Sequence, residues 1–318
     1  TRSCRVHQLL WVCALAVDRG ARHFASDLGC ARTGAASGKM NATLEQLRRY
    51  QVRPKQSLGQ NFLLDEAIRD RIVDTAELMP EDSVLEIGPG LGTLTSSLAA
   101  RARKVVAVEL DDRLIEILQR RFAQESHVSV IHGNILDLDP VDLIGPIDHS
   151  YKVIANLPYY ITSAVLRHIL EVRKRPQMAV FMVQEEVAER ICAAPGRLSI
   201  LAVSVQLYAQ PRIVQRVPAE AFYPRPKVGS ALLRLDVFSE PVVKDVPVRR
   251  FFQVVRAGFS QKRKQLANSL SAGLALSKKT TRAALVSAGV DPRRRPETVD
   301  LQEWRDICLA LPSVEPAG

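Results

Sequence analysis

Two short segments of the chain carry groups that suit the binding of a nucleobase and of a nucleotide-like cofactor. Residues 156–159, Asn-Leu-Pro-Tyr, offer a carboxamide, a turn with outward-facing carbonyls and an aromatic face. Such groups can hold a planar base together with its exocyclic amine. Residues 88–92, Gly-Pro-Gly-Leu-Gly, predict a strand-to-helix turn whose backbone N–H groups can meet the cofactor. In this order, the two segments favour a methyltransferase that modifies the amino group of a base.

Both segments follow short apolar runs that are typical of buried strands, at 84–87 and 151–155. Either segment alone would more simply be a turn, because glycine, asparagine and proline are turn formers. Their common place after a strand changes that interpretation, since open α/β sheets bind ligands at the carboxyl ends of their strands.

Two further predicted strands are followed by polar residues that could contact the same cofactor. Glu109 ends the next strand, 21 residues beyond Gly88, where a carboxylate can accept hydrogen bonds from two ribose hydroxyls. NAD-dependent enzymes share this arrangement, but the glycine run here is not G-x-G-x-x-G, which disfavours a dinucleotide. Asn134 follows the third strand and Asn156 ends the fourth. Four successive strand ends with usable groups indicate S-adenosylmethionine.

The pattern of apolar residues predicts an α/β fold with a parallel, doubly wound, Rossmann-like sheet. Strands and helices alternate from residue 83 onward, and the last two strands are expected to form an antiparallel pair at the edge. The predicted strands are 84–88, 104–109, 128–132, 152–156, 178–183, 211–217 and 229–237. The predicted helices are 43–50, 65–78, 92–102, 111–122, 162–172, 185–193, 197–207, 247–259, 263–271, 279–288 and 300–310.

The strands stop after residue 240, which predicts three parts of the chain. Residues 40–240 are expected to form the methyltransferase domain, and residues 241–318 a small all-α domain that binds RNA. Residues 1–39 are interpreted as an extension, disordered or non-native, because a clean helical start follows Met40. An organelle transit peptide is the alternative for this extension.

Charge is distributed unevenly, and its distribution points to a polyanionic partner. The formal net charge is +10, yet residues 40–239 carry 24 basic and 24 acidic side chains. Residues 240–318 carry 14 basic and 8 acidic side chains. A basic appendage beside a neutral cofactor domain suggests nucleic acid. Cysteine spacing, with no CxxC pair, disfavours a zinc site and a disulfide framework. We therefore expect an intracellular, cytoplasmic protein without a metal.

Six motifs in order resemble the KsgA family of small-subunit rRNA adenine dimethyltransferases over roughly residues 45–312. They are Gly-Gln-Asn-Phe-Leu at 59–63, Glu-Ile-Gly-Pro-Gly at 86–90, Val-Glu-Leu-Asp at 108–111, Asn-Leu-Pro-Tyr at 156–159, Ala-Phe-Tyr-Pro-Arg-Pro-Lys-Val at 221–228 and Phe-Ser-Gln-Lys-Arg-Lys at 259–264. The resemblance implies an S-adenosylmethionine-dependent methyltransferase sheet with a helical C-terminal domain.

The resemblance also implies a set of cofactor-binding residues. With Gly90 of the same turn added, they are Asn61, Leu63, Gly88, Gly90, Glu109, Asn134 and Asn156. The chain departs from the family pattern at two places. Asn134 stands where the family usually has aspartate, and Gln-Glu-Glu at 184–186 replaces Gln-Lys-Glu. An amide lacks the charge of a carboxylate, although its carbonyl can still accept from an amino group.

The predicted reaction relies on positioning more than on acid–base groups. If the Asn156 side-chain carbonyl and the Leu157 backbone carbonyl accept the two hydrogens of an adenine amine, its nitrogen can pyramidalise toward the methyl donor. Pro158 completes this turn, and no histidine is required. Tyr159 and Phe222 are candidates to stack on the target base. The candidate catalytic residues are therefore Asn156, Leu157, Pro158, Tyr159 and Phe222.

Seven basic residues are candidates for RNA binding. Four are expected to line the mouth of the site, and three are expected to start the helix at 263–271. They are Arg53, Lys55, Arg225, Lys227, Lys262, Arg263 and Lys264.

The sequence thus predicts an rRNA adenine N6-dimethyltransferase that acts on two adjacent adenosines near the 3′ end of small-subunit rRNA. The substrate position comes from the family resemblance. The alternatives are a large-subunit adenine dimethylase, a DNA adenine methyltransferase and a non-catalytic ribosome-assembly or mitochondrial transcription factor. The expected partner is the small ribosomal subunit, with no membrane involved, and the protein is expected to be a monomer.

Overall fold

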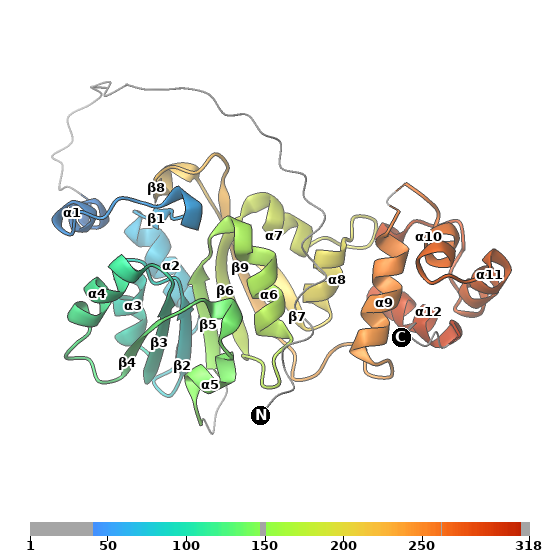
Figure 1. Ribbon diagram of the computed structural model, residues 1–318, viewed down its shortest axis with the longest axis horizontal. Coiled ribbons are helices and arrows are strands. Elements are labelled where there is room, and N and C mark those ends of the chain that lie inside the picture. The colour runs from blue at the N-terminus through green and yellow to red at the C-terminus, as the bar shows by residue number, and fades with distance from the viewer. Residues whose placement is uncertain (1–40, 147–150, 262, 313–318) are drawn as a thin grey trace. The chain divides into compact units, whose positions relative to one another are not determined.

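The computed structural model describes residues 41–146, 151–261 and 263–312, and these residues contain a seven-stranded sheet with helices on both faces (Figure 1). The strand order is β4-β3-β2-β5-β6-β9-β7. The first five of these strands run parallel, while β9 is antiparallel to β6 and to β7. The strands are β2 (Ser83–Ile87), β3 (Lys104–Glu109), β4 (Val128–His132), β5 (Tyr151–Asn156), β6 (Met178–Gln184), β7 (Ala209–Val217) and β9 (Ser230–Val237). The predicted doubly wound fold is confirmed.

The chain order reverses between β2 and β5. From β2 the chain proceeds to β3 and β4 on one side, and β5 then starts the other half against β2. Such a switch point leaves a crevice at the carboxyl ends of the two central strands. The segments at 88–92 and 156–159 lie at these two ends.

Alternate residues of the central strands enter two different cores. Val84 and Val105 pack with helices α2 and α3, whereas Leu85 and Val106 belong to the core that contains α6 and α8. These residues are fully buried. Successive side chains of a strand point to opposite faces, and helices cover both faces of this sheet. Apolar residues are therefore favoured at successive positions, which explains the continuous apolar runs.

The helices of the first part agree with the predicted ones to within a few residues. They are α1 (Ala42–Arg49), α2 (Glu66–Thr75), α3 (Thr93–Ala99), α4 (Asp112–Arg121), α5 (Pro140–Ile144), α6 (Thr162–Leu170), α7 (Glu185–Ile191) and α8 (Ile200–Gln206). Asp65 caps α2 as expected, because its side chain accepts from the Ile68 N–H at 3.2 Å. The short helix α5 was not predicted.

The predicted edge pair is also confirmed. β7 pairs antiparallel with β9 and lies at the edge of the sheet. Pro211, which lacks an N–H, is tolerated on this edge strand because it removes no hydrogen bond between interior strands. A small second sheet was not predicted. In it, β1 (Phe62–Leu63) pairs antiparallel with β8 (Phe222–Tyr223). Two-residue strands separated by about 160 positions leave no periodic signal.

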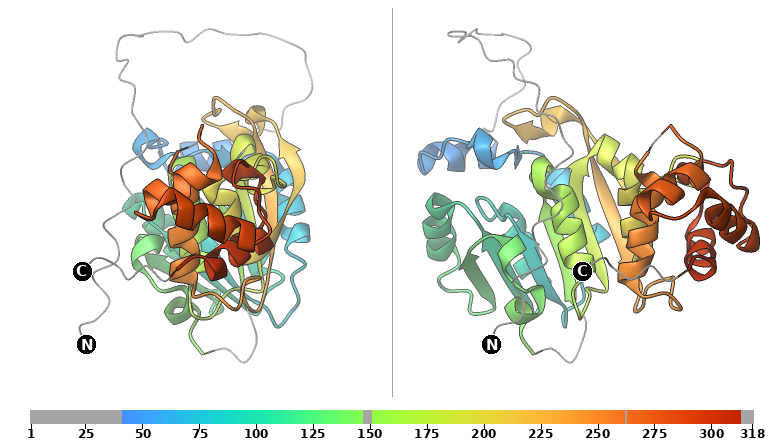
Figure 2. Two further views of the ribbon diagram at one scale, coloured as in Figure 1. Left: turned by 90° about the vertical axis from the view of Figure 1, so that its right-hand side faces the viewer. Right: turned by 45° about the vertical axis from the view of Figure 1, so that its right-hand side comes forward.

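Helices alone follow residue 240 in the part of the chain that the structure describes, as predicted. They are α9 (Val248–Phe259), α10 (Leu266–Gly273), α11 (Lys278–Ser287) and α12 (Leu301–Ala310). Figures 1 and 2 show them gathered beyond α8, which contacts α9. Phe251 and Trp304 belong to the same hydrophobic core as strands of the sheet. The division into two domains at residue 240 stays a prediction.

One predicted helix start was wrong. The helix expected at 263–271 begins at Leu266, so Arg263 and Lys264 lie in the turn before α10. The side chain of Gln265, at the N-cap, makes no capping bond, and the apolar periodicity starts only at Leu266. Lys262 and the extension at 1–39 lie outside the described residues. Within the described ranges, no helix is both long and apolar enough to span a membrane.

Candidate functional site

A cleft lies at the carboxyl ends of β2, β3 and β5, where the strand order reverses. It encloses about 1300 Å³, including its open mouth. Its walls come from the glycine-rich turn, the ends of β3 and β4, the turn after β5, and the segment around β1. The structure therefore brings most of the predicted site residues together. Those in its wall are Asn61, Leu63, Gly88, Gly90, Glu109, Asn134, Asn156, Leu157, Pro158 and Tyr159.

The glycine-rich turn follows β2 directly and has backbone angles that favour glycine. Gly88 and Gly90 have φ values of 70° and 61°, in the left-handed region that other residues rarely adopt. A Cβ atom on Gly90 would also lie only 3.2 Å from the Phe62 ring. The Gly88 N–H donates to the Val108 carbonyl at 2.9 Å, which joins the turn to β3. With glycine at these two positions, neither adds a side chain to this wall of the cleft.

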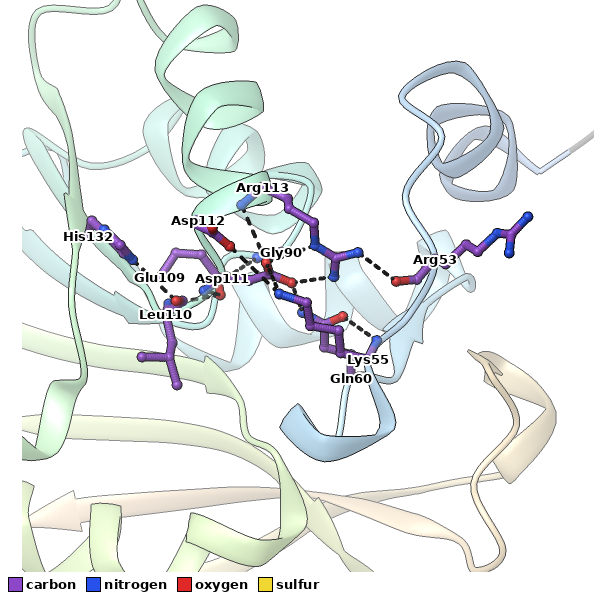
Figure 3. Close-up of polar contacts among 10 residues, drawn as sticks. All are labelled: Arg53, Lys55, Gln60, Gly90, Glu109, Leu110, Asp111, Asp112, Arg113 and His132. Carbon is purple, nitrogen blue, oxygen red and sulfur yellow. Dashed lines mark hydrogen bonds and ion pairs between the residues drawn. The ribbon is translucent and has the colours of Figure 1, made fainter.

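Glu109 ends β3 with its carboxylate held by backbone N–H groups (Figure 3). Its Oε1 accepts from the N–H groups of Leu110 and Asp111, both at 2.9 Å, and its Oε2 accepts from the Gly90 N–H at 3.1 Å. The residue is only 6% exposed. Burial raises the pKa of Glu109, although the three backbone bonds oppose that rise. The carboxylate is thus fixed in direction beside the glycine-rich turn.

Asn156 ends β5, the strand next to β2, and is linked to the segment around β1. Its Nδ2 donates to the Asn61 carbonyl at 3.0 Å. This bond engages the donor half of the Asn156 amide and leaves its carbonyl as the group that a substrate amine can use. Residues 95 positions apart in the chain therefore share one corner of the cleft.

The turn after Asn156 is held by hydrogen bonds on its buried side. Leu157 is 2% exposed, and its N–H donates to the Met182 carbonyl at 3.1 Å. The Pro158 carbonyl accepts from the Ile161 N–H, which starts a short 3-10 helix. The Tyr159 hydroxyl lies 2.8 Å from Ser230 Oγ. The Tyr159 ring is therefore anchored at its far end while it contributes to the cleft wall.

Asn134 lies at the corner after β4 and uses both ends of its amide locally. Its Oδ1 accepts from the Leu136 N–H at 3.2 Å, and its Nδ2 donates to Asp137 Oδ2 at 3.0 Å. These bonds cap the short 3-10 helix at Ile135–Asp137. A ligand that approaches Asn134 therefore meets a side chain whose orientation is already set.

The structure does not bring Phe222 into the wall of the cleft. Phe222 is 3% exposed and packs in the core that contains α2 and α3. Its neighbour Tyr223 is 45% exposed, because successive side chains of a strand point to opposite faces. The stacking role of Phe222 stays a prediction.

The candidate RNA-binding residues differ in their surroundings. Arg53, Lys227, Arg263 and Lys264 are exposed. Arg225 forms an ion pair with Glu220. Lys55 Nζ lies 2.9 Å from Asp111 Oδ1, so this lysine has an acidic partner inside the protein.

The sequence analysis did not identify Glu86 as part of the cleft wall. Glu86 is 1% exposed, and its Oε2 has no hydrogen-bond partner among the described residues. Burial raises the pKa of Glu86 to about 8. Leu110 and Tyr160 were also missed, although both line the cleft and are 46% and 60% exposed. Their only sequence signal was adjacency to Glu109 and Tyr159.

In the parts that the structure describes, no group of three or more metal-ligating side chains could hold an ion.

Comparisons with known proteins agree with this geometry. Residues 52–311 match the family model described as ribosomal RNA adenine dimethylase. Ribosomal RNA small subunit methyltransferase A from Dehalococcoides mccartyi is 42% identical over 275 residues, covering 86% of this chain and 94% of that protein. The protein of the same name from Moorella thermoacetica is 43% identical over 278 residues, covering 85% and 96%.

Two solved structures are similar over most of the chain. The crystal structure of 23S rRNA methyltransferase ErmE has a TM-score of 0.63 and 31% identity, covering 79% of this chain and 99% of that one. A dimethyladenosine transferase from Plasmodium falciparum has a TM-score of 0.68 and 26% identity, covering 78% and 96%.

Proposed function

The chain belongs to the ribosomal RNA adenine dimethylase family, and we propose that its cleft brings S-adenosylmethionine together with an adenine of small-subunit rRNA. The predicted resemblance and fold are thereby confirmed. Relatives named for the small subunit are 42–43% identical, whereas ErmE, named for 23S rRNA, is 31% identical. This difference favours small-subunit over large-subunit rRNA. The function is therefore adenine N6-dimethylation of small-subunit rRNA.

One observation supports the proposed site most directly. A single cleft is lined by the glycine-rich turn and Glu109 and also by Asn156 and Tyr159. The first group suits a nucleoside-bearing cofactor, because a fixed carboxylate at a strand end can accept from ribose hydroxyls. The second group suits a planar base with an amine. A non-catalytic factor would not need both groups intact.

The residues present fit S-adenosylmethionine. Glu109, beside Gly88 and Gly90, would accept hydrogen bonds from the ribose hydroxyls. Asn134 would contact the edge of the adenine of the cofactor. Leu63 and Asn61 would close the cleft from the segment around β1. When bound, S-adenosylmethionine supplies an electrophilic methyl group on a positively charged sulfur.

Asn156 and the Leu157 carbonyl would act on the substrate amine. Accepting its two hydrogens draws the nitrogen lone pair out of conjugation with the ring and directs it toward the methyl group. With the base held in this way, the amine would accept the methyl group that S-adenosylmethionine supplies, and one proton of the amine would be released to solvent. Pro158 holds the turn that presents both carbonyls.

Tyr159 would stack on the adenine after that base has left its helix. Its hydroxyl contact with Ser230 fixes the ring before the base arrives, so little side-chain freedom is lost on binding. Stacking contributes about 1–3 kcal/mol per base. Phe222 would have to leave its buried position to stack as well.

The RNA would bind across exposed basic residues near the cleft and before α10. Arg53, Lys227, Arg263 and Lys264 are the exposed candidates, and contacts to phosphate would make the affinity depend on salt. We propose that the protein works as a monomer on small subunits in the cytoplasm, without a metal. The two adjacent adenosines near the 3′ end remain the proposed target.

A comparison of substrates tests this proposal. The protein is incubated with radiolabelled S-adenosylmethionine and with undermodified small or large ribosomal subunits. We expect label in small-subunit rRNA only. Label in large-subunit rRNA alone would support the large-subunit alternative, and binding without transfer to either would support a non-catalytic role.

A further inference from the structure

Asp111, a buried carboxylate close to Glu109, links the N-terminal part of the chain to the end of β3. The side chain of Asp111 has no exposed surface. Its Oδ1 accepts from Lys55 Nζ at 2.9 Å and from Arg113 Nε at 3.0 Å. Its Oδ2 accepts from Gln60 Nε2 at 2.8 Å and from Arg113 Nη2 at 2.6 Å. We call Lys55, Gln60, Asp111 and Arg113 the Asp111 cluster (Figure 3).

The Asp111 cluster also fixes the backbone of the N-terminal loop. Gln60 Oε1 accepts from the Lys55 N–H at 2.8 Å. Arg113 Nη1 donates to the Arg53 carbonyl at 3.2 Å, while the Arg53 side chain points away from the cluster (Figure 3). Two positions of the loop are therefore held directly, and both depend on side chains that converge on Asp111.

The held loop leads straight into a wall of the cleft. Residues 58–64, which we call the wall segment, line the same cleft as Glu109. The far end of this segment is held independently, because Asn156 Nδ2 donates to the Asn61 carbonyl and the Leu64 N–H donates to the Ala221 carbonyl at 2.7 Å. Only the near end, at Gln60, depends on Asp111.

We propose that Asp111 is a positioning residue for the cofactor, which acts by holding the near end of the wall segment against the cleft. This inference rests on the proposed binding of S-adenosylmethionine. Asp111 comes two residues after Glu109, whose Oε1 accepts from the Asp111 N–H. One corner of the chain thus fixes both the carboxylate proposed to bind the ribose and the near end of the wall segment.

Electrostatics explain why this contact can order the loop. Burial disfavours the charged form of Asp111, but hydrogen bonds from Arg113, Lys55 and Gln60 outweigh it and hold the pKa of Asp111 well below its usual range. A buried carboxylate needs these partners, since leaving it unpaired is costly. The loop is therefore ordered before the cofactor arrives, and cofactor binding does not bear the entropy of ordering it.

Asp111→Asn is the main test, and Asp112→Asn is its matched control. Asparagine can still cap α4, where Asp111 accepts from the Arg113 N–H, so the helix start is kept. The control removes the same charge one position later, from a side chain that is 77% exposed and 3.6 Å from Lys55 Nζ. Lys55→Met removes one of the three partners of Asp111 from a partly exposed position and should fold normally.

The measurements are the affinity for S-adenosylmethionine by calorimetry, KM and kcat with small subunits, and Tm. We expect Asp111→Asn and Lys55→Met each to weaken cofactor binding about five- to fiftyfold. The double variant should be little weaker than either single variant, because both lose one shared contact. For Asp111→Asn, KM for the cofactor should rise far more than kcat falls. Asp112→Asn should bind like wild type.

Three results would overturn the inference. In the first, wild type binds the cofactor but Asp111→Asn binds equally well, which leaves the proposed function intact. In the second, Asp111→Asn lowers Tm while Lys55→Met keeps full affinity, which makes Asp111 purely structural. In the third, wild type itself does not bind S-adenosylmethionine, which also removes the proposed function.

Discussion

Replacing Glu109 by glutamine should sharply weaken the binding of S-adenosylmethionine. The wild-type carboxylate accepts from three backbone N–H groups on two oxygens, whereas glutamine has one acceptor oxygen. If that oxygen keeps its bonds to Leu110 and Asp111, the new amide nitrogen faces the Gly90 N–H across 3.1 Å, donor against donor. A ribose hydroxyl loses a charged acceptor at the same time.

The magnitude follows from the bonds that are lost. A hydrogen bond to a charged group contributes about 1.5–3 kcal/mol. Losing one such bond to the ribose and disturbing the Gly90 contact amounts to roughly 2–4 kcal/mol. The dissociation constant should therefore rise about 30- to 700-fold.

Calorimetric titration with S-adenosylmethionine measures this change, with Glu116→Gln as the control. Glu116 lies on α4 with its side chain 74% exposed, and it forms a surface ion pair with Arg120. Because burial raises the pKa of Glu109, wild-type affinity should also decline as the pH falls through that raised value. A Glu109→Gln affinity within threefold of wild type would refute the assigned role.

The remaining variants address stability, base capture and RNA binding. As the pH rises from about 4.5 to 8, the free energy of unfolding of the wild type should fall, relative to that of Glu86→Gln, by about 1.4 kcal/mol per pH unit. The unfolded chain releases this proton before the buried Glu86 does, and parallel stability curves for the two proteins would contradict the expectation. Tyr159→Leu should slow methyl transfer but keep cofactor affinity, as rate and calorimetric measurements would show; lost affinity at an unchanged rate would make this ring part of the core. Arg263→Glu with Lys264→Glu should weaken RNA binding and reduce the slope of log K against log salt by roughly 0.7–0.9 per lost phosphate contact. An unchanged slope and affinity would locate the RNA surface elsewhere.

Much of the fold was predictable because its signals are local. The cap at Asp65, the apolar runs of β2 and β5, and the acidic end of β3 each lie within a few residues. Local order also placed Glu109 and Asn156 at strand ends, and parallel strands then bring their carboxyl ends to one side of the sheet.

The rest depended on contacts between distant positions. Lys55 and Asp111 are 56 positions apart, so the sequence indicated Lys55 only as a candidate for RNA binding and not as a partner of Asp111. The motif around Phe222 made its ring a candidate to stack on the target base, whereas in the structure Phe222, on β8 paired with β1, is buried in the core. The start of α10 was misplaced because helix ends leave weak signals without a capping side chain.

The central claim is that Asn156 presents a target adenine amine to the methyl donor within this cleft. The most direct test is nucleoside mass spectrometry of small-subunit rRNA treated with wild type or Asn156→Ala at saturating S-adenosylmethionine. We expect N6,N6-dimethyladenosine with wild type and, because the variant loses a positioned acceptor, a rate lower by about a hundredfold or more. Calorimetry and Tm should show that Asn156→Ala stays folded. Dimethyladenosine formed by the variant at the wild-type rate would contradict the account.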